Sequence, residues 1–144
     1  MAHMTQLDAL KQIAAQNGGL LRPSAVVEAA RDENSPLHSA FCWDDTEAAR
    51  LYRLDQAQRL IRSFRFKVED DGKSVDVPVF VNISIDRTGT KDSNPYRLTE
   101  DVAKMPNLLE IAEKDALDQL KGLRDRYGHL KRLGNIWTAI DNAQ

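Results

Sequence analysis

An alternation of apolar and polar residues between positions 64 and 85 is the feature that most constrains the fold of this chain. Aromatic and aliphatic residues alternate with charged ones up to the turn sequence Asp-Asp-Gly-Lys at 70–73. A second alternating run follows, whose apolar members are Val75, Val77, Val79, Val81, Ile83 and Ile85. Period-two alternation on both sides of a glycine-containing turn predicts a β-hairpin over residues 64–86. Pro78 predicts an open strand edge at that point, because proline donates no ladder hydrogen bond.

Helical patterns flank this hairpin on both sides. Apolar residues at steps of three and four predict three helices before it, over about 5–16, 24–31 and 45–62. Thr5 is a predicted N-cap, Gly18 and Gly19 a stop, and Asp44 or Asp45 the cap of the third helix. Behind the hairpin, similar spacing predicts a short helix from Thr99, a long one over about 108–126 and a last one that is interrupted near Gly134.

The predicted fold class is therefore α+β and mostly helical. It has a three-helix N-terminal part over 5–63, the hairpin over 64–86 and C-terminal helices over 99–142. We expect one domain over 5–144, preceded by a cloning remnant at 1–4. Three helices followed by a hairpin is the order of a winged helix-turn-helix. The loop at 32–43 is longer than the tight turn of that motif, and its apolar residues are expected to pack under the domain.

The composition excludes several classes of protein to which this chain could belong. The 144 residues carry 20 Lys+Arg against 22 Asp+Glu, for a net charge of −2, which excludes a uniformly basic coating protein. No apolar run is long enough to cross a membrane, so we expect no membrane partner. The single cysteine, Cys42, excludes an internal disulfide framework and fits a reducing cytoplasm.

A basic segment covers the third predicted helix and the first strand. Between positions 50 and 67 there are six basic residues and one acidic residue, Asp55. The basic residues are Arg50, Arg53, Arg59, Arg62, Arg65 and Lys67. A recognition helix followed by a wing presents phosphate contacts in this way, so these residues are the candidate nucleic-acid site. The alternative is a solvated helix face on which Asp55 and Arg59 form an i,i+4 pair.

Arg53 is unusual within this segment because it falls in the predicted apolar stripe of the helix. The other members of that stripe are Ala49, Gln56, Ala57, Leu60, Ile61 and Phe64. A cation in such a place must extend to solvent, pair with a carboxylate or face a partner. We expect an ion pair with Asp44, Asp45 or Glu47, because buried charges are usually paired.

A second basic group lies near the C-terminus. Its members are Lys121, Arg124, Lys131 and Arg132, with Arg126 between them. Acidic residues dominate the first half of the same long helix, and acid before base is the order that the helix dipole favours. The alternatives are a second nucleic-acid contact and a charged subunit interface. The apolar stripe of this helix and Trp137 lead us to expect a homo-oligomer.

The residues with catalytic or metal-binding chemistry form no recognisable motif. His38, Cys42, Asp44 and Asp45 are of ligand type, but they lack a second Cys/His pair at metal-ligand spacing. Cys42 is expected to be a small buried apolar residue between Phe41 and Trp43. Phosphate-binding loops, nucleophile elbows and zinc-binding helices are absent. We therefore expect no enzyme, cofactor or metal; a metal-dependent nuclease using Asp44, Asp45 and Glu47 is the weakest alternative.

One stretch of sequence resembles small bacteriophage and prophage proteins of uncharacterised function. The matching features are the run Pro-Leu-His-Ser-Ala-Phe-Cys-Trp-Asp-Asp at 36–45, followed by Ala48-Ala49, Tyr52-Arg53, Gln56-Ala57 and Leu60-Ile61-Arg62. Leu21 to Val27 and Tyr127 to Leu130 hold similar places. Cys42 departs from the pattern, which has an acidic residue before the tryptophan. The resemblance implies a phage or prophage protein in the bacterial host cytoplasm, and it carries over no catalytic residue.

Two functional hypotheses follow. The first is a non-enzymatic DNA-binding protein of phage type that regulates or handles DNA through the basic helix and hairpin. The second is a phage assembly or host-takeover factor that binds a host or phage protein through Arg53, Trp43 and the C-terminal helices.

Overall fold

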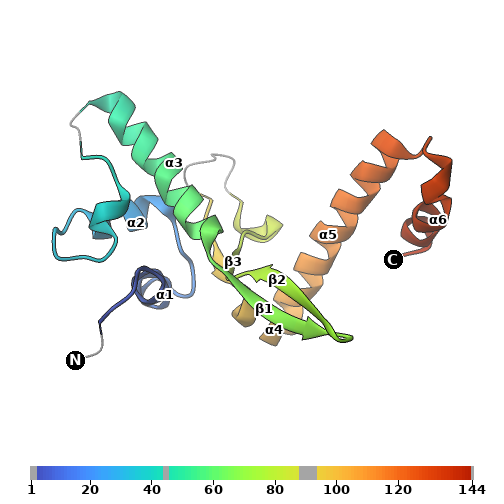
Figure 1. Cartoon of the computed structure of the whole chain (residues 1–144), viewed down its shortest axis with the longest axis horizontal. Helices are drawn as coiled ribbons and strands as arrows, with labels where there is room; N and C mark the ends of the chain where they lie inside the picture. The colour runs from blue at the N-terminus through green and yellow to red at the C-terminus, as the bar shows by residue number, and fades with distance from the viewer. Residues whose placement is uncertain (1–2, 44–45, 88–93, 144) are drawn as a thin grey trace.

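The computed structural model describes residues 3–43, 46–87 and 94–143 (Figure 1). Within them the fold is α+β and mostly helical, as predicted. The helices are α1 (Gln6–Gln16), α2 (Pro23–Ala30), α3 (Glu47–Ser63), α4 (Thr99–Lys104), α5 (Pro106–Tyr127) and α6 (Gly134–Asn142). The strands are β1 (Arg65–Asp70), β2 (Lys73–Pro78), β3 (Phe80–Val81) and β4 (Arg97–Leu98). Short 3₁₀ turns are η1 (His38–Ala40), η2 (Ser84–Asp86) and η4 (Lys131–Leu133).

Local capping sets the ends of the N-terminal helices. The Thr5 hydroxyl accepts a hydrogen bond from the Asp8 amide at 3.1 Å, and the Asp8 carboxylate accepts one from the Thr5 amide, so both orphan donors are satisfied. Gly18 and Gly19 end α1 with φ of 66° and 87°. At α3 the cap is Thr46, whose hydroxyl accepts from the Ala49 amide at 3.1 Å. The cap was expected at 44 or 45, which lie outside the described residues.

The main core lies between the first three helices. Its largest fully buried aliphatic and aromatic side chains are Leu10, Leu21, Val26, Leu37, Ile61 and Phe80. Leu37 and Phe41 bring the 32–43 loop into this core, as expected. The buried face of α3 is centred on Leu54, Ala57 and Ile61, whereas several members of the predicted stripe are only half-buried. The true stripe is therefore rotated relative to the predicted one, because the core lies nearer to Leu54 than to Gln56.

The hairpin is shorter than predicted. β1 and β2 pair antiparallel from Arg65 opposite Pro78 to Asp70 opposite Lys73, and the two turn residues, Asp71 and Gly72, have φ of 49° and 77°. These positive angles are those of a type I′ turn, which matches the strand twist. After Pro78 the chain leaves this ladder, and β3 pairs antiparallel with β4 instead. The predicted single hairpin over 64–86 is wrong beyond Pro78.

The change of partner also separates the apolar residues expected on one face. Ile83 is fully buried, whereas Ile85, in the η2 turn, is 62% exposed. Both strands of the remaining hairpin are largely exposed, and they project from the body as an arm (Figure 1). The hairpin is therefore a surface feature and contributes little to the main core.

The C-terminal helices form a second arm. Ile83, Val102 and Leu108 make a small separate core that anchors the start of α5. The Ser84 amide donates to the Asp115 carboxylate at 2.7 Å. Burial raises the pKa of Asp115, but hydrogen bonds from Ser84 together with the nearby charges of Arg87 and Lys114 hold it below its usual value. Beyond this anchor α5 leaves the body, and α6 turns back beside its far end (Figure 1).

The far end of the arm is held by polar contacts. Arg124 forms an ion pair with Asp141, which ties α6 to α5, and the Trp137 indole donates to the Leu130 carbonyl at 3.3 Å. Gly134 begins α6, where the interruption was predicted. No helix in the described ranges is long and apolar enough to cross a membrane.

Candidate nucleic-acid interface

Two of the predicted arginines lie on the solvent side of α3. Arg59 and Arg62 are three residues apart, which places them on neighbouring turns of one helix face, away from the buried row. The Arg59 side chain is 72% exposed and pairs with Asp55 at 2.9 Å, the i,i+4 pair expected as the alternative to DNA binding. Arg62 lies over Gln58 and donates to its carbonyl and side-chain oxygens at 3.4 Å.

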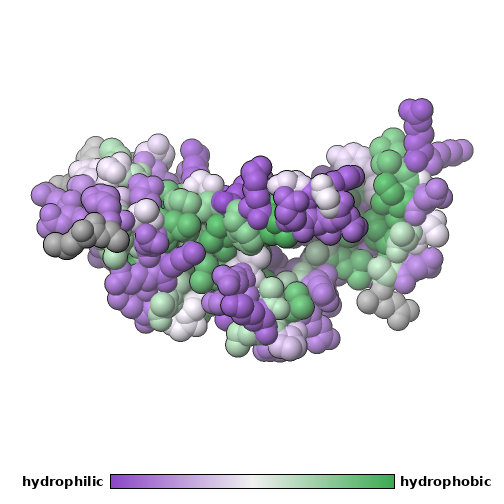
Figure 2. Space-filling view, turned by 60° about the horizontal axis from the view of Figure 1, so that its bottom comes forward, coloured by the Kyte–Doolittle hydropathy of each residue, from purple (hydrophilic) through white to green (hydrophobic). Residues whose placement is uncertain are grey.

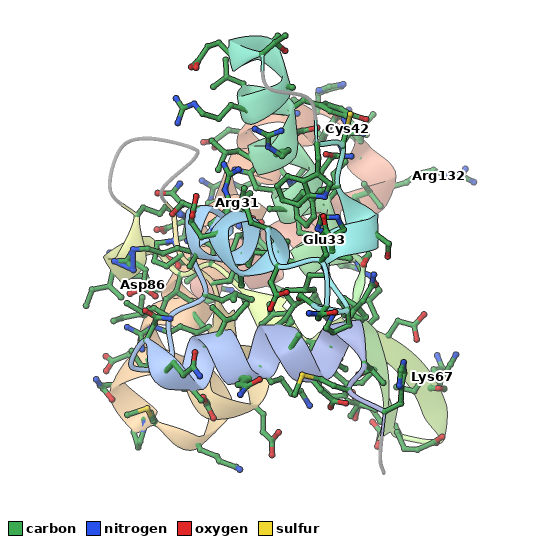
Figure 3. The ribbon with its side chains drawn as sticks, turned by 90° about the vertical axis from the view of Figure 1, so that its left-hand side faces the viewer. Arg31, Glu33, Cys42, Lys67, Asp86 and Arg132 are labelled. Atoms are coloured by element: carbon green, nitrogen blue, oxygen red, sulfur yellow. The ribbon has the colours of Figure 1, made fainter. Side chains whose placement is uncertain are left out.

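The next two basic residues continue from the helix onto the hairpin. Arg65 and Lys67 alternate with Phe66 along β1, so they lie on the opposite face of the strand from that ring. Lys67 is opposite Asp76 in the ladder, and their charged groups are 3.5 Å apart. Figure 3 shows Lys67 at the edge of the molecule. Arg59 and Arg62 on α3 and Arg65 and Lys67 on β1 are all exposed and follow one another along the chain, and we name these four residues the basic row.

Arg50 does not belong to this row. It precedes Arg59 by nine residues, about two and a half helical turns, so it projects from the other side of α3. Its guanidinium donates to Glu47 at 3.0 Å, and this hydrogen bond lowers the pKa of the Glu47 carboxyl. The predicted nucleic-acid site is therefore divided, because Arg50 projects from the side of α3 opposite to Arg59.

Arg53 is also removed from the predicted interface, because it is 4% exposed. Its Nη1 donates to the Cys42 carbonyl at 3.1 Å, and its guanidinium carbon lies 5.2 Å from the centre of the Trp43 ring. The expected carboxylate partner is not confirmed: Glu47 pairs with Arg50, and positions 44 and 45 lie outside the described residues. Sequence reasoning placed Arg53 on the buried stripe correctly but missed the aromatic partner.

The Trp43 cluster consists of Arg31, His38, Phe41, Trp43 and Arg53. The His38 ring stacks on the indole with centroids 5.0 Å apart, and the Arg31 guanidinium lies 5.6 Å from the indole centre. The indole also donates to the His38 carbonyl at 2.9 Å. A His38 ring nitrogen is 2.8 Å from the Ala30 carbonyl. These contacts join α2, the 32–43 loop and α3. The long loop therefore fixes the orientation of α3 relative to α2.

Cys42 contradicts its predicted burial. The structure leaves it exposed, because its backbone amide donates to Gln56 and its carbonyl accepts from Arg53, which hold the main chain against α3 and turn the thiol outward (Figure 3). Within the described ranges no three His, Cys, Asp or Glu side chains are grouped to hold a metal ion.

The second basic group lies at the opposite end of the molecule. Figure 1 shows the end of α5 and α6 far from α3. Arg124 is engaged by Asp125 and Asp141, whereas Lys131 and Arg132 are exposed on η4. Lys121 is half-buried. This group is therefore separate from the basic row.

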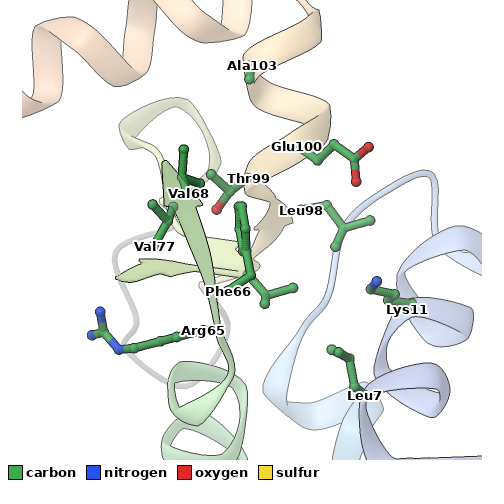
Figure 4. A pocket seen from close by; sticks show the side chains of 11 residues that line it. Leu7, Lys11, Arg65, Phe66, Val68, Val77, Leu98, Thr99, Glu100 and Ala103 are labelled. Atoms are coloured by element: carbon green, nitrogen blue, oxygen red, sulfur yellow. The ribbon is translucent and has the colours of Figure 1, made fainter. Parts of the chain in front are cut away.

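An apolar groove lies on the other face of the hairpin. It has a volume of about 620 Å³ and is lined by apolar side chains of β1 and β2 together with α1, β4 and α4. Figure 4 shows Phe66 directed into it, with Leu7 and Leu98 opposite and Arg65 pointing away. Figure 2 shows apolar surface in the middle of this side of the molecule. The alternation of Phe66 and Val68 was the sequence signal for this surface, but nothing local indicated what it would face.

No family model, no curated protein and no solved structure matches the chain.

Proposed function

We propose that the protein binds double-stranded DNA through the basic row, with α3 as the recognition helix and the β1–β2 hairpin as a wing. The observation that carries the proposal is the continuity of Arg59 and Arg62 on the solvent face of α3 with Arg65 and Lys67 on the hairpin beside it. The order α1, α2, α3 and hairpin supports a winged-helix-like arrangement. The Trp43 cluster holds α3 rigidly against the rest of the domain, and a helix that contacts DNA in one orientation needs such support.

The ion pairs on this surface do not oppose the proposal. Asp55 and Asp76 partner Arg59 and Lys67 at exposed positions. Exposed pairs of this kind are worth about 0–1 kcal/mol, so phosphate oxygens can replace the carboxylates at small cost. In the phage or prophage setting that the sequence resemblance implies, such a protein regulates or handles DNA in the host cytoplasm without catalysing a reaction.

The test is fluorescence anisotropy with a labelled DNA duplex over a series of salt concentrations. We expect binding that weakens with salt, with a log–log slope of about −0.9 for each contacted phosphate. Arg59→Ala with Arg62→Ala should make that slope shallower by about two units, because two phosphate contacts are lost. No binding at low salt, or a slope unchanged in the double variant, overturns the proposal.

The matched control is Arg50→Ala. This arginine lies on the same helix and has the same kind of exposed carboxylate partner, but it projects from the other side. Its loss should leave the slope unchanged. Replacing Lys131 and Arg132 with alanine tests the second basic group separately: an unchanged slope confines the contact to the basic row, and a shallower one adds the end of the arm to it.

A second candidate function is binding to a host or phage protein through the same face of α3. Leu51 and Tyr52 are about half exposed near the start of the helix, and Tyr52 lies two turns before Arg59 on the same side. Tyrosine and arginine are frequent anchors of protein interfaces. Arg53 is buried and is no longer a contact residue for this candidate.

Pull-down from a bacterial lysate, with and without nuclease, separates the two candidates. A defined protein that stays bound after nuclease treatment and is lost with Tyr52→Ser supports the second. A partner that is lost on nuclease treatment supports the first.

A further inference from the structure

An apolar row along α5 is left exposed by the fold. Leu109, Leu120, Leu123 and Tyr127 are 38–44% exposed, and Ala116 lies between them. The steps of four, three and four from Ala116 to Tyr127 are those of a coiled-coil seam. Leu130 continues the row three residues later and is also exposed. Figure 2 shows apolar surface over the C-terminal helices.

The partners of α5 within the chain lie on other sides of the helix. Leu108, Ile111 and Ala112 face the small second core next to α4 and η2. Arg124 reaches Asp141 of α6 from another side of the helix, the side on which helix geometry also places the half-buried Leu117 and Lys121. The α5 row falls between these two contact sides, and no described element covers it.

The charges beside the row say what kind of helix fits it. Glu110 and Glu113 lie beside the row in the first half of α5, whereas Arg124 and Arg126 flank it in the second. A second α5 running in the opposite direction places each acidic half against a basic half. A parallel partner places like charges together, which is destabilising. The charge pattern is thus complementary to its own reversed copy, which is the property of a two-fold interface.

Glu113 is the residue that distinguishes a parallel from an antiparallel pair of α5 helices. It occupies the seam position between Leu109 and Ala116, and it is the only charged residue there within the described helix. In a parallel pair, two Glu113 carboxylates face each other. In an antiparallel pair centred near residue 118, Glu113 lies beside the Arg124 and Arg126 end of the other copy. A polar seam residue of this kind selects orientation in coiled coils.

We propose that two copies of this chain associate through the α5 row as an antiparallel, two-fold-symmetric pair. In this pairing Leu109 of one copy packs opposite Tyr127 of the other. Near the two-fold axis Ala116 packs opposite Leu120, and the small alanine side chain lets the backbones approach. The helix is about 33 Å long, so the seam runs along the whole contact between the arms. The proposal is independent of DNA binding.

The first test is the mass of the full chain in solution, measured by light scattering after size exclusion over a range of concentrations and without DNA. We expect twice the chain mass of 16.2 kDa. Leu120→Asp with Leu123→Asp should give the single-chain mass with unchanged helical circular dichroism, since both side chains are exposed within one chain. Leu51→Asp, a control at another exposed leucine, should leave the mass doubled. A single-chain mass for the unaltered protein overturns the proposal.

The second test determines orientation by disulfide cross-linking in a Cys42→Ser background. A mixture of Leu109→Cys chains and Tyr127→Cys chains should form the mixed dimer on oxidation, and Leu109→Cys chains alone should not. Cross-linking of Leu109→Cys with itself indicates a parallel pair and overturns the antiparallel arrangement.

Charge exchange gives a readout that a purely structural role of these residues would not show. Glu113→Lys should weaken association about tenfold or more, because a lysine then lies beside the basic end of the other copy. Adding Arg126→Glu should restore it. Equal weakening in the double variant counts against the antiparallel charge pairing.

Discussion

At the scale of single residues, burial decides what an arginine does in this protein. Arg50, Arg53 and Arg59 belong to one helix and one basic segment, yet only Arg53 is enclosed. Its guanidinium lies against the Trp43 ring and donates to the Cys42 carbonyl. Arginine suits such a place because its planar, weakly hydrated group both stacks on an aromatic ring and donates hydrogen bonds.

We predict that Arg53→Lys lowers the free energy of unfolding by about 1–3 kcal/mol. An ammonium group is more strongly hydrated and lacks the planar surface that contacts the indole. Urea denaturation followed by far-ultraviolet circular dichroism measures the change. Arg50→Lys is the control, since its pair with Glu47 is exposed and the substitution should change stability far less. Equal effects of the two substitutions would contradict the role assigned to the Trp43 cluster.

At the scale of elements, one ion pair joins the η2 turn to β4. Arg97 donates from Nε and Nη2 to the two carboxylate oxygens of Asp86 at 2.6 and 2.9 Å, and the Asp86 side chain is 7% exposed. This hydrogen bonding raises the pKa of Arg97 above its usual value. A bidentate pair fixes orientation as well as distance, so it holds together the two ends of the segment between them.

Asp86→Ala should lower the free energy of unfolding by about 2–4 kcal/mol, because it leaves the Arg97 charge half-enclosed without its carboxylate. The measurement is again urea denaturation at neutral pH. Glu100→Ala removes an ion pair with Lys104 whose side chains are both exposed. That control should cost far less. A loss for Asp86→Ala no larger than for Glu100→Ala would show that the pair is not structural.

At the scale of the whole molecule, burial is distributed unevenly. The main core takes residues from α1, α2 and α3, whereas the buried residues of α5 and α6 are Leu108 and Ile140. Stability against local opening follows buried contacts. The α5–α6 arm is therefore the part of the molecule that gains most from a second copy.

We predict that backbone amides of α5 beyond residue 113 exchange hydrogen faster than those of α1 and α3 when the protein is dilute. Raising the protein concentration should slow exchange in α5 and leave α1 and α3 unchanged, because association adds contacts to the arm alone. Hydrogen exchange with mass spectrometry at two concentrations measures this. Exchange in α5 that is slow and independent of concentration would contradict it.

Much of the secondary structure could be predicted from sequence because its signals are local. The Thr5 cap, the stop at Gly18 and Gly19 and the Asp71-Gly72 turn each depend on residues within one turn of chain. The helix periodicities gave element type and approximate length, although the cap of α3 was expected one or two residues too early. The Asp55–Arg59 pair was also predictable, since helix geometry alone brings those side chains together.

The candidate site was only partly predictable. Charge counting found every member of the basic row, but it grouped them with Arg50 and Arg53. Helix geometry already puts Arg50 and Arg59, nine residues apart, on opposite sides of α3, but a count of charges ignores direction. It also cannot see that Arg53 lies against the ring of Trp43, ten residues earlier in the chain.

By itself the sequence determined where helices and the hairpin turn form, because caps, turn residues and hydrophobic periodicity act over a few residues. Only the tertiary structure decided that the strand changes partner after Pro78, that Arg53 is enclosed by the Trp43 cluster and that the α5 row stays exposed. Each of these depends on which distant segments pack together. Pairing and burial are set by the whole chain competing for a limited apolar interior, and no local pattern records the outcome of that competition.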